Sequence, residues 1–188
     1  GRFPVAADHP RNLFTLFAPL YSLHVREEAT TLCAPRLCRG PPMSRRRAVT
    51  ITRRVPRETP EERYVRIHAN LAHGRTRRFQ AFVEGIQAGE RLHVLHALLP
   101  HVPFRYLPSG RWYRTFPHLD TFRGARIRFL VEQAYQRHLL QLQGTDRLLG
   151  HLLDRLEELG IYDSALVALV ADHGISFRVG RQRRLVRP

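Results

Sequence analysis

The chain has 188 residues, enough for one domain with a substantial apolar core, and no apolar run approaches the roughly 20 residues of a membrane-spanning helix. Its formal charge is +15 and all 31 basic residues are arginine, so its surface attracts anions such as phosphate or sulfate esters, acidic lipids or nucleic acid. The sequence has no zinc-finger spacing, no helix-turn-helix pattern and no aromatic RNA-binding strand, and we therefore expect no nucleic-acid partner.

The first 32 residues predict a short helix followed by a strand. The helix begins after Pro10 with Asn12 as its N-cap, and the apolar run over residues 21–25 indicates the strand. Cys33 and Cys38 follow, without a second cysteine pair that could complete a structural zinc site. A local disulfide in an oxidising compartment and two free thiols in a turn both fit this pair.

Residues 39–60 are predicted to form a flexible loop, because the stretch from Cys33 to Pro60, both included, holds five prolines and the triplet Arg45-Arg46-Arg47. A helical pattern then begins at Thr59, whose spacing to Glu62 matches a capping box, and continues towards Ile86. The apolar run over residues 92–99 predicts a strand that is buried on both faces.

The second half of the chain predicts a long loop, a long helical region and another strand. Residues 127–159 carry the strongest helical periodicity, with Gly144 as a point that divides it into two helices and Gly160 as its stop signal. The apolar run over residues 165–171 predicts a second buried strand. The order strand, helix, strand predicts an α/β fold with a mostly parallel sheet flanked by helices.

Polar residues follow both predicted buried strands, where ligands bind in parallel sheets. The first strand leads to His101, and the second leads to Asp172 and His173, followed by Gly174. A carboxylate and an imidazole side by side, at a turn that glycine permits, can bind one divalent cation, and zinc or manganese suits this ligand pair. Taken alone, Asp-His-Gly is more typical of an aspartate that caps a turn beside an exposed histidine.

The residues around this motif resemble the sulfatases of the alkaline-phosphatase superfamily. Residues 145–174 combine the patterns D-x-x-x-G, L-x-x-L, G-x-Y-D, an apolar run and D-H-G, which is similar to the helix, turn and strand that precede the late metal ligands of that family. The element His96-Ala-Leu-Leu-Pro-His101-Val-Pro103 resembles the sulfatase strand that ends in Pro-His-x-Pro. Residues 105–110 and 10–16 resemble a bacterial branch of sulfatase-like proteins that is often preceded by membrane helices.

This resemblance implies a partial alkaline-phosphatase-like fold, with residues 1–188 as part of a single sulfatase-like catalytic domain. It implies that Asp172 and His173 are metal ligands and that His101 donates a hydrogen bond to the ester anion. The implied activity is metal-dependent hydrolysis or transfer of a sulfate or phosphate ester, with zinc, manganese or calcium as the ion. The implied location is the extracytoplasmic face of a bacterial membrane, with anchoring through segments that are absent from this sequence.

The family's attacking residue and its early carboxylate ligands have no counterpart here. The segment Cys33-Ala-Pro-Arg-Leu37 departs from the sulfatase motif C-x-P-x-R, because Leu37 stands where the arginine belongs. We therefore expect an internal fragment that is inactive alone and has no catalytic residue of its own. The alternative function is a non-catalytic module that uses the same fold to bind an anion or a lipid surface.

Several other polar residues are expected to be structural. His93 and His96 are expected to be packed or surface histidines beside the first buried strand. Asp146 and Asp154 lie on the polar side of the long helical region, and Arg178 belongs to a basic stretch that is solvated.

Overall fold

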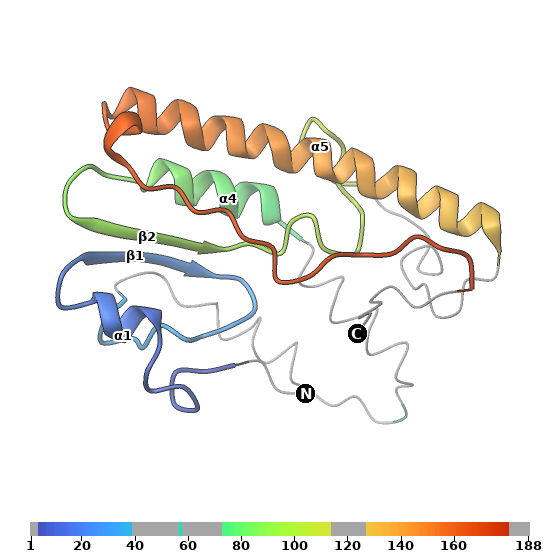
Figure 1. Ribbon diagram of the computed structural model, residues 1–188. Coiled ribbons are helices and arrows are strands. Elements are labelled where there is room, and N and C mark those ends of the chain that lie inside the picture. The colour runs from blue at the N-terminus through green and yellow to red at the C-terminus, as the bar shows by residue number, and fades with distance from the viewer. Residues whose placement is uncertain (1–3, 39–56, 58–72, 114–126, 181–188) are drawn as a thin grey trace.

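The structure, a computed structural model, describes residues 4–38, 57, 73–113 and 127–180 (Figure 1). The predicted N-cap at Thr59 lies outside these residues, as does the predicted loop at 39–60 except for Arg57. The elements in chain order are α1 (Leu13–Phe17), β1 (Ser22–Glu27), α4 (Arg75–Glu84), β2 (Arg91–His96), α5 (Arg128–Glu158) and the 3-10 turn η2 (Tyr162–Ser164).

The two strands pair in parallel, and α4 lies between them in the chain. Residues Ser22 to Glu27 of β1 align one by one with residues Arg91 to His96 of β2. Parallel strands need a long crossover connection, and a helix is the usual one. Figure 1 shows α5 above α4, α4 above the two strands, and α1 beyond β1. The predicted class is confirmed: a partial α/β fold with a small parallel sheet and helices.

The short helix α1 begins where the sequence predicts it. The Asn12 side chain accepts hydrogen bonds from the backbone N–H groups of Phe14 (2.9 Å) and Thr15 (3.2 Å), and the Asn12 backbone N–H donates to the Thr15 hydroxyl (3.0 Å). These are the bonds of a capping box, which satisfies donors that the first helical turn leaves without partners. Asn12 is therefore the predicted N-cap.

The long helix α5 is continuous, so the prediction that Gly144 divides it is wrong. A β-carbon at position 144 would lie 2.9 Å from the carbonyl oxygen of Leu107, so the glycine lets that loop approach the helix closely. The predicted stop at Gly160 is confirmed. Gly160 has a φ of 66°, and the N–H groups of Gly160 and Ile161 bond to the carbonyls of Glu157 (2.8 Å) and Leu156 (3.0 Å).

The apolar core forms where α4 packs on α5. On α4 the buried side chains recur at spacings of three and four positions, which places them on one face of the helix, as expected for an amphipathic helix. Burial of each large apolar side chain stabilises the fold by about 1.5–3 kcal/mol. The buried members of this cluster are Phe79, Phe82, Val83 and Ile86 of α4 and Leu148 and Leu156 of α5.

Residues 165–171 are extended but form no strand with β1 or β2, so the prediction of a second buried strand is wrong for the described structure. Leu166 is 97% exposed and Val170 is 85% exposed. A buried strand needs a neighbouring strand to bond with and cover on its faces, and the described residues supply neither here. The segment runs back in the direction opposite to α5 (Figure 1).

No described helix combines the length and the apolar character that a membrane span requires.

Candidate functional site

The loop after β2, residues 97–106, carries His101 and is held by a buried arginine from α4. We call this segment the His101 loop. Arg75 is only 1% exposed, and its guanidinium donates to the carbonyls of Leu98 (2.8 Å), His101 (2.6 Å) and Val102 (2.9 Å). A buried guanidinium is costly unless hydrogen bonds satisfy its donors, so these three carbonyls both stabilise Arg75 and determine the path of the loop.

A fully buried glutamine from α5 holds the same loop from the other side. The Gln141 side-chain nitrogen donates to the carbonyls of Pro100 and His101, both at 2.9 Å. Its side-chain oxygen accepts from the backbone N–H groups of Arg105 (2.9 Å) and Tyr106 (3.3 Å). One side chain on a long helix therefore connects the start and the end of the His101 loop.

A buried carboxylate at the end of β1 connects the loop to the sheet. Glu28 forms an ion pair with Arg78 of α4 and accepts a hydrogen bond from the backbone N–H of Leu98 (2.7 Å). Because the Glu28 carboxylate is buried, loss of Arg78 would leave a buried charge without its ion-pair partner. Glu28, which directly follows β1, thus joins Arg75 of α4 and Gln141 of α5 in bonding to the loop.

The structure brings the imidazoles of His101 and His173 together, with their ring centroids 6.0 Å apart. The Nδ1 atom of His101 lies 2.8 Å from the carbonyl oxygen of Val102, and the Nδ1 atom of His173 lies 2.8 Å from that of Gly174. A carbonyl only accepts hydrogen bonds, so each Nδ1 carries a proton. In its neutral form each ring therefore has its lone pair on Nε2.

Asp172 lies beside His173 in a geometry that one cation can bridge. Its Oδ2 atom is 3.8 Å from the His173 Nε2 atom, and its side chain is 89% exposed. Zinc binds each such ligand at about 2 Å, so two ligands of one ion lie within about 4 Å of each other. Residues Asp172 and His173 therefore fit two ligand positions. Within the described ranges no group of three or more His, Cys, Asp or Glu could complete such a site.

The sequence predictions missed the buried polar residues that hold the His101 loop. A signal exists in α5 for Gln141 and for Arg137, whose guanidinium donates to the Phe104 carbonyl (2.8 Å): the buried positions of this helix follow helical spacing and include both polar residues. A polar side chain on such a stripe needs partners inside the protein. The buried residues of α5 are Val131, Ala134, Arg137, Gln141, Gly144, Leu148 and Leu156.

The other histidines of β2 form contacts within the sheet region. The Nδ1 atom of His93 lies 2.9 Å from the Nδ1 atom of His24, its partner in the strand register, and His96 bonds to the Thr30 hydroxyl (3.0 Å). Burial lowers the pKa of both His24 and His93, and their mutual repulsion lowers that of His24 further. These contacts agree with a packed, structural role for His93 and His96, while Asp146 and Asp154 are exposed.

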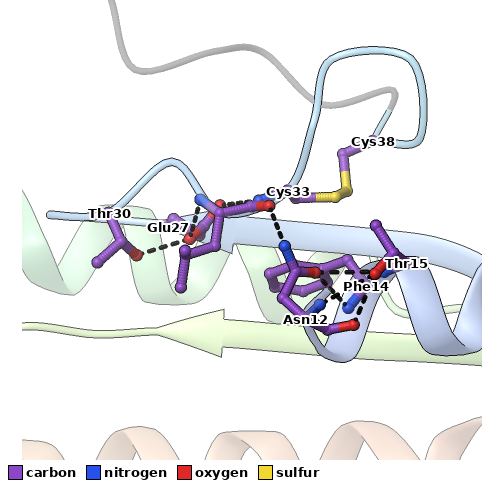
Figure 2. Close-up of a disulfide and its surroundings, with 8 residues drawn as sticks. Asn12, Phe14, Thr15, Glu27, Thr30, Cys33 and Cys38 are labelled. Atoms are coloured by element: carbon purple, nitrogen blue, oxygen red, sulfur yellow. Dashed lines mark hydrogen bonds between the residues drawn. A yellow bond between two sulfur atoms is a disulfide. The ribbon is translucent and has the colours of Figure 1, made fainter. Parts of the chain in front are cut away.

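Cys33 and Cys38 form a disulfide, with their Cα atoms 6.0 Å apart, so the alternative of two free thiols is wrong. Figure 2 shows the disulfide beside the start of α1 and the end of β1. The Glu27 carboxylate accepts from the backbone N–H groups of Leu32 and Cys33, both at 2.9 Å. The sulfur of Cys33 is therefore bonded and is not available as a nucleophile.

Comparison with known proteins identifies the family. The sequence model of the Sulfatase family matches residues 61–185, a range that covers more than half of the chain and includes His101, Asp172 and His173. No curated protein and no solved structure matches the chain. Sulfatases are hydrolases of sulfate esters and generally use a divalent metal ion. The chain therefore belongs to the sulfatase family, within the alkaline-phosphatase superfamily.

Proposed function

We propose that His101, Asp172 and His173, here called the paired-histidine site, take part in metal-dependent hydrolysis or transfer of a sulfate or phosphate ester. The observation that carries this proposal is the 6.0 Å separation of the His101 and His173 rings inside the matched range of the sulfatase family. Those two residues are 72 positions apart in the sequence numbering, so their proximity is a tertiary feature.

Asp172 and His173 would hold the cation, which could be zinc, manganese or calcium; zinc and manganese suit a mixed oxygen and nitrogen pair best. The bound ion would neutralise charge on the ester oxygens and polarise the bond that breaks. His101 would bind the ester anion. In its imidazolium form it donates Nδ1–H to the Val102 carbonyl and has Nε2–H for an ester oxygen.

The attacking group would come from a segment outside these residues, so the chain alone is inactive and residues 1–188 are part of a single catalytic domain. Two features support this. The sequence lacks a segment that fits the family's nucleophile motif, and Cys33, the residue that most resembles one, is in a disulfide. The reaction would proceed through a covalent intermediate on that outside residue.

The substrate would be an anionic ester, attracted by the excess of 31 basic over 16 acidic residues, with no nucleic-acid partner. The location would be the extracytoplasmic face of a bacterial membrane, with anchoring through segments outside this sequence. The disulfide supports this location, because disulfides form and persist in oxidising compartments.

Metal binding and ester hydrolysis test the proposal together. On the intact protein that contains this chain, we expect chelation to abolish hydrolysis of 4-nitrophenyl sulfate or 4-nitrophenyl phosphate. We expect Asp172→Ala and His173→Ala to weaken zinc or manganese binding at least about tenfold in calorimetry. Asp154→Ala and His151→Ala are matched controls, because these residues are exposed on α5 and lie outside the site. Equal metal affinity in all four variants would remove the basis of the proposal.

The second candidate is a non-catalytic module that binds an anion or a lipid surface, and the charge of +15 favours it. Such a module would bind vesicles with acidic lipids equally well with and without a chelator and would release them at high salt. Persistence of anion binding in the Asp172→Ala variant, together with absence of ester hydrolysis in the intact protein, would favour this function over the enzyme.

A further inference from the structure

We propose that Gln141 and Arg75 are positioning residues for His101, which determine where its imidazole lies and which ring nitrogen faces the ester. This inference rests on the proposed function, because it assigns a purpose to the orientation of His101. It concerns residues that lie on two different helices and that touch neither Asp172 nor His173 in the described hydrogen bonds.

The His101 peptide carbonyl accepts hydrogen bonds from two side chains. Its oxygen accepts from the Arg75 guanidinium (2.6 Å) and from the Gln141 side-chain nitrogen (2.9 Å). Carbonyl oxygens have two lone pairs, so these two donors use the full capacity of the atom. The peptide plane next to the imidazole therefore has little freedom to rotate.

Arg75 is also linked to the ring itself. The Val102 carbonyl accepts from the Arg75 guanidinium (2.9 Å) and from the His101 Nδ1–H (2.8 Å). Arg75 thus fixes the position of the Val102 carbonyl, and this carbonyl accepts the hydrogen bond that keeps the His101 ring proton on Nδ1. The same carbonyl thus selects the tautomer and directs Nε2 away from the backbone, in the way that a hydrogen bond at one ring nitrogen determines the role of the other.

The support itself is rigid. Gln141 is fully buried on α5, and it bonds to two carbonyls and two N–H groups of the His101 loop. Its amide is the side-chain group that can donate and accept in this arrangement, because a carboxylate only accepts and an apolar group does neither. A buried polar group with all its bonds formed contributes to a unique local geometry.

Gln141→Glu is the most specific test. Glutamate keeps the oxygen that accepts from Arg105 and Tyr106, but its second oxygen replaces the nitrogen that donates to the Pro100 and His101 carbonyls. Nitrogen NMR of the imidazoles at pH 8 reports which ring nitrogen of His101 carries the proton. We expect a single Nδ1–H form in the unchanged chain and a mixture of both tautomers in the variant. The control is Gln143→Glu, the same substitution at an exposed position of α5, which should leave the His101 signals unchanged.

Two further measurements keep the inference testable if Gln141→Glu does not fold. In the unchanged chain, His101 must show the Nδ1–H form and magnetisation transfer to the His173 ring. In Arg75→Lys, which keeps the charge but loses the planar set of donors, the Nδ1–H preference should weaken. A His101 tautomer that is mixed in the unchanged chain, or unaltered in a folded Gln141→Glu or Arg75→Lys variant, would overturn the assignment.

Failure of this inference can be distinguished from failure of the proposed function. Zinc titration of the intact protein that contains this chain should give the same affinity with and without Gln141→Glu, because the proposed ligands are Asp172 and His173. In the intact enzyme, kcat/KM should fall by about ten- to a hundredfold, mainly through kcat, as expected for a misplaced catalytic group. Absence of zinc binding in the intact protein that contains this chain would refute the metal site and leave the tautomer result as a separate finding.

Discussion

The His101 loop and the segment that carries Asp172 and His173 hold their functional residues in different ways. The buried side chains of Glu28, Arg75 and Gln141 bond to the backbone of the His101 loop. The second segment, residues 165–178, is mostly exposed between Ala165 and Asp172, and its His173 ring lies beside that of His101. Ala165 bonds to Ile161, and Phe177 packs on Phe104 and Tyr135 with ring centroids 6.0 and 5.3 Å apart.

This difference shows that a pair of neighbouring side chains can have one partner that is locally rigid and one that is locally labile. Local opening costs little free energy where few groups are buried and much where buried polar bonds must break. We therefore expect the position of His173, and with it the cation site, to depend on further contacts more strongly than the position of His101 does.

The largest expected effect comes from removal of the buried guanidinium. Arg75→Met should lower the free energy of unfolding by at least about 3 kcal/mol, because the carbonyls of Leu98, His101 and Val102 each lose a hydrogen bond from the guanidinium, at roughly 1 kcal/mol or more each. Urea denaturation measures this loss. Arg178→Met, at an exposed arginine of the second segment, should change stability by less than about 0.5 kcal/mol. Similar losses in the two variants would contradict the comparison.

A smaller effect is expected at the disulfide between Cys33 and Cys38, which lies beside α1 (Figure 2). The double variant Cys33→Ser and Cys38→Ser should lose about 2 kcal/mol, the entropic contribution expected for closure of a short loop. Reduction of the disulfide in the unchanged chain should lower the free energy of unfolding by a similar amount, measured by urea denaturation. A double variant as stable as the oxidised chain would show that the bonds of Glu27 to Leu32 and Cys33 suffice.

Acid should weaken the sheet beneath the His101 loop. Burial holds the pKa values of His24 and His93 below 6.5, with Arg91 and Arg26 nearby, so the unfolded chain binds protons first as the pH falls. Stability contributed by this pair is present above about pH 6.5 and declines as the pH falls towards the folded-state values. His24→Gln should reduce this decline, measured as unfolding midpoints between pH 7.5 and 5, and His151→Gln, at an exposed site, should not.

The smallest effect is expected in the exposed segment. Leu166→Ser should change the free energy of unfolding by less than about 0.5 kcal/mol, because the leucine is 97% exposed and loses almost no contact. Thermal unfolding monitored by circular dichroism is sensitive enough to test this. A loss above 2 kcal/mol would mean that the Leu166 side chain is buried in solution. The second segment would then be held by buried contacts, as the His101 loop is.

Local signals predicted the regular elements well. Asn12 marks the start of α1 and Gly160 follows the end of α5. Both could be predicted because capping and the left-handed conformation depend on a few adjacent residues. Parallel pairing of β1 and β2 agreed with the predicted class, although the strand expected over residues 165–171 does not pair with them. Whether an apolar run becomes a buried strand depends on which strand lies beside it, and that information is not local.

The candidate site could be predicted only in part for the same reason. Family motifs indicated His101, Asp172 and His173, and the structure places the two histidine rings together, while their roles stay predictions. Arg75 and Gln141 have no motif of their own. Their partners are carbonyls of the His101 loop, and the path of that backbone cannot be read from residue types at positions 75 and 141.

The contact at Gly144 has a consequence for how α5 and the adjoining loop could change together. Alanine there would favour the isolated helix by about 1 kcal/mol, yet its methyl group would meet the Leu107 carbonyl oxygen at 2.9 Å. Backbone on both sides of the contact would have to separate, and the shift would reach Tyr106 and the rest of the His101 loop. A substitution that improves the helix would therefore alter the geometry of an imidazole that it never touches.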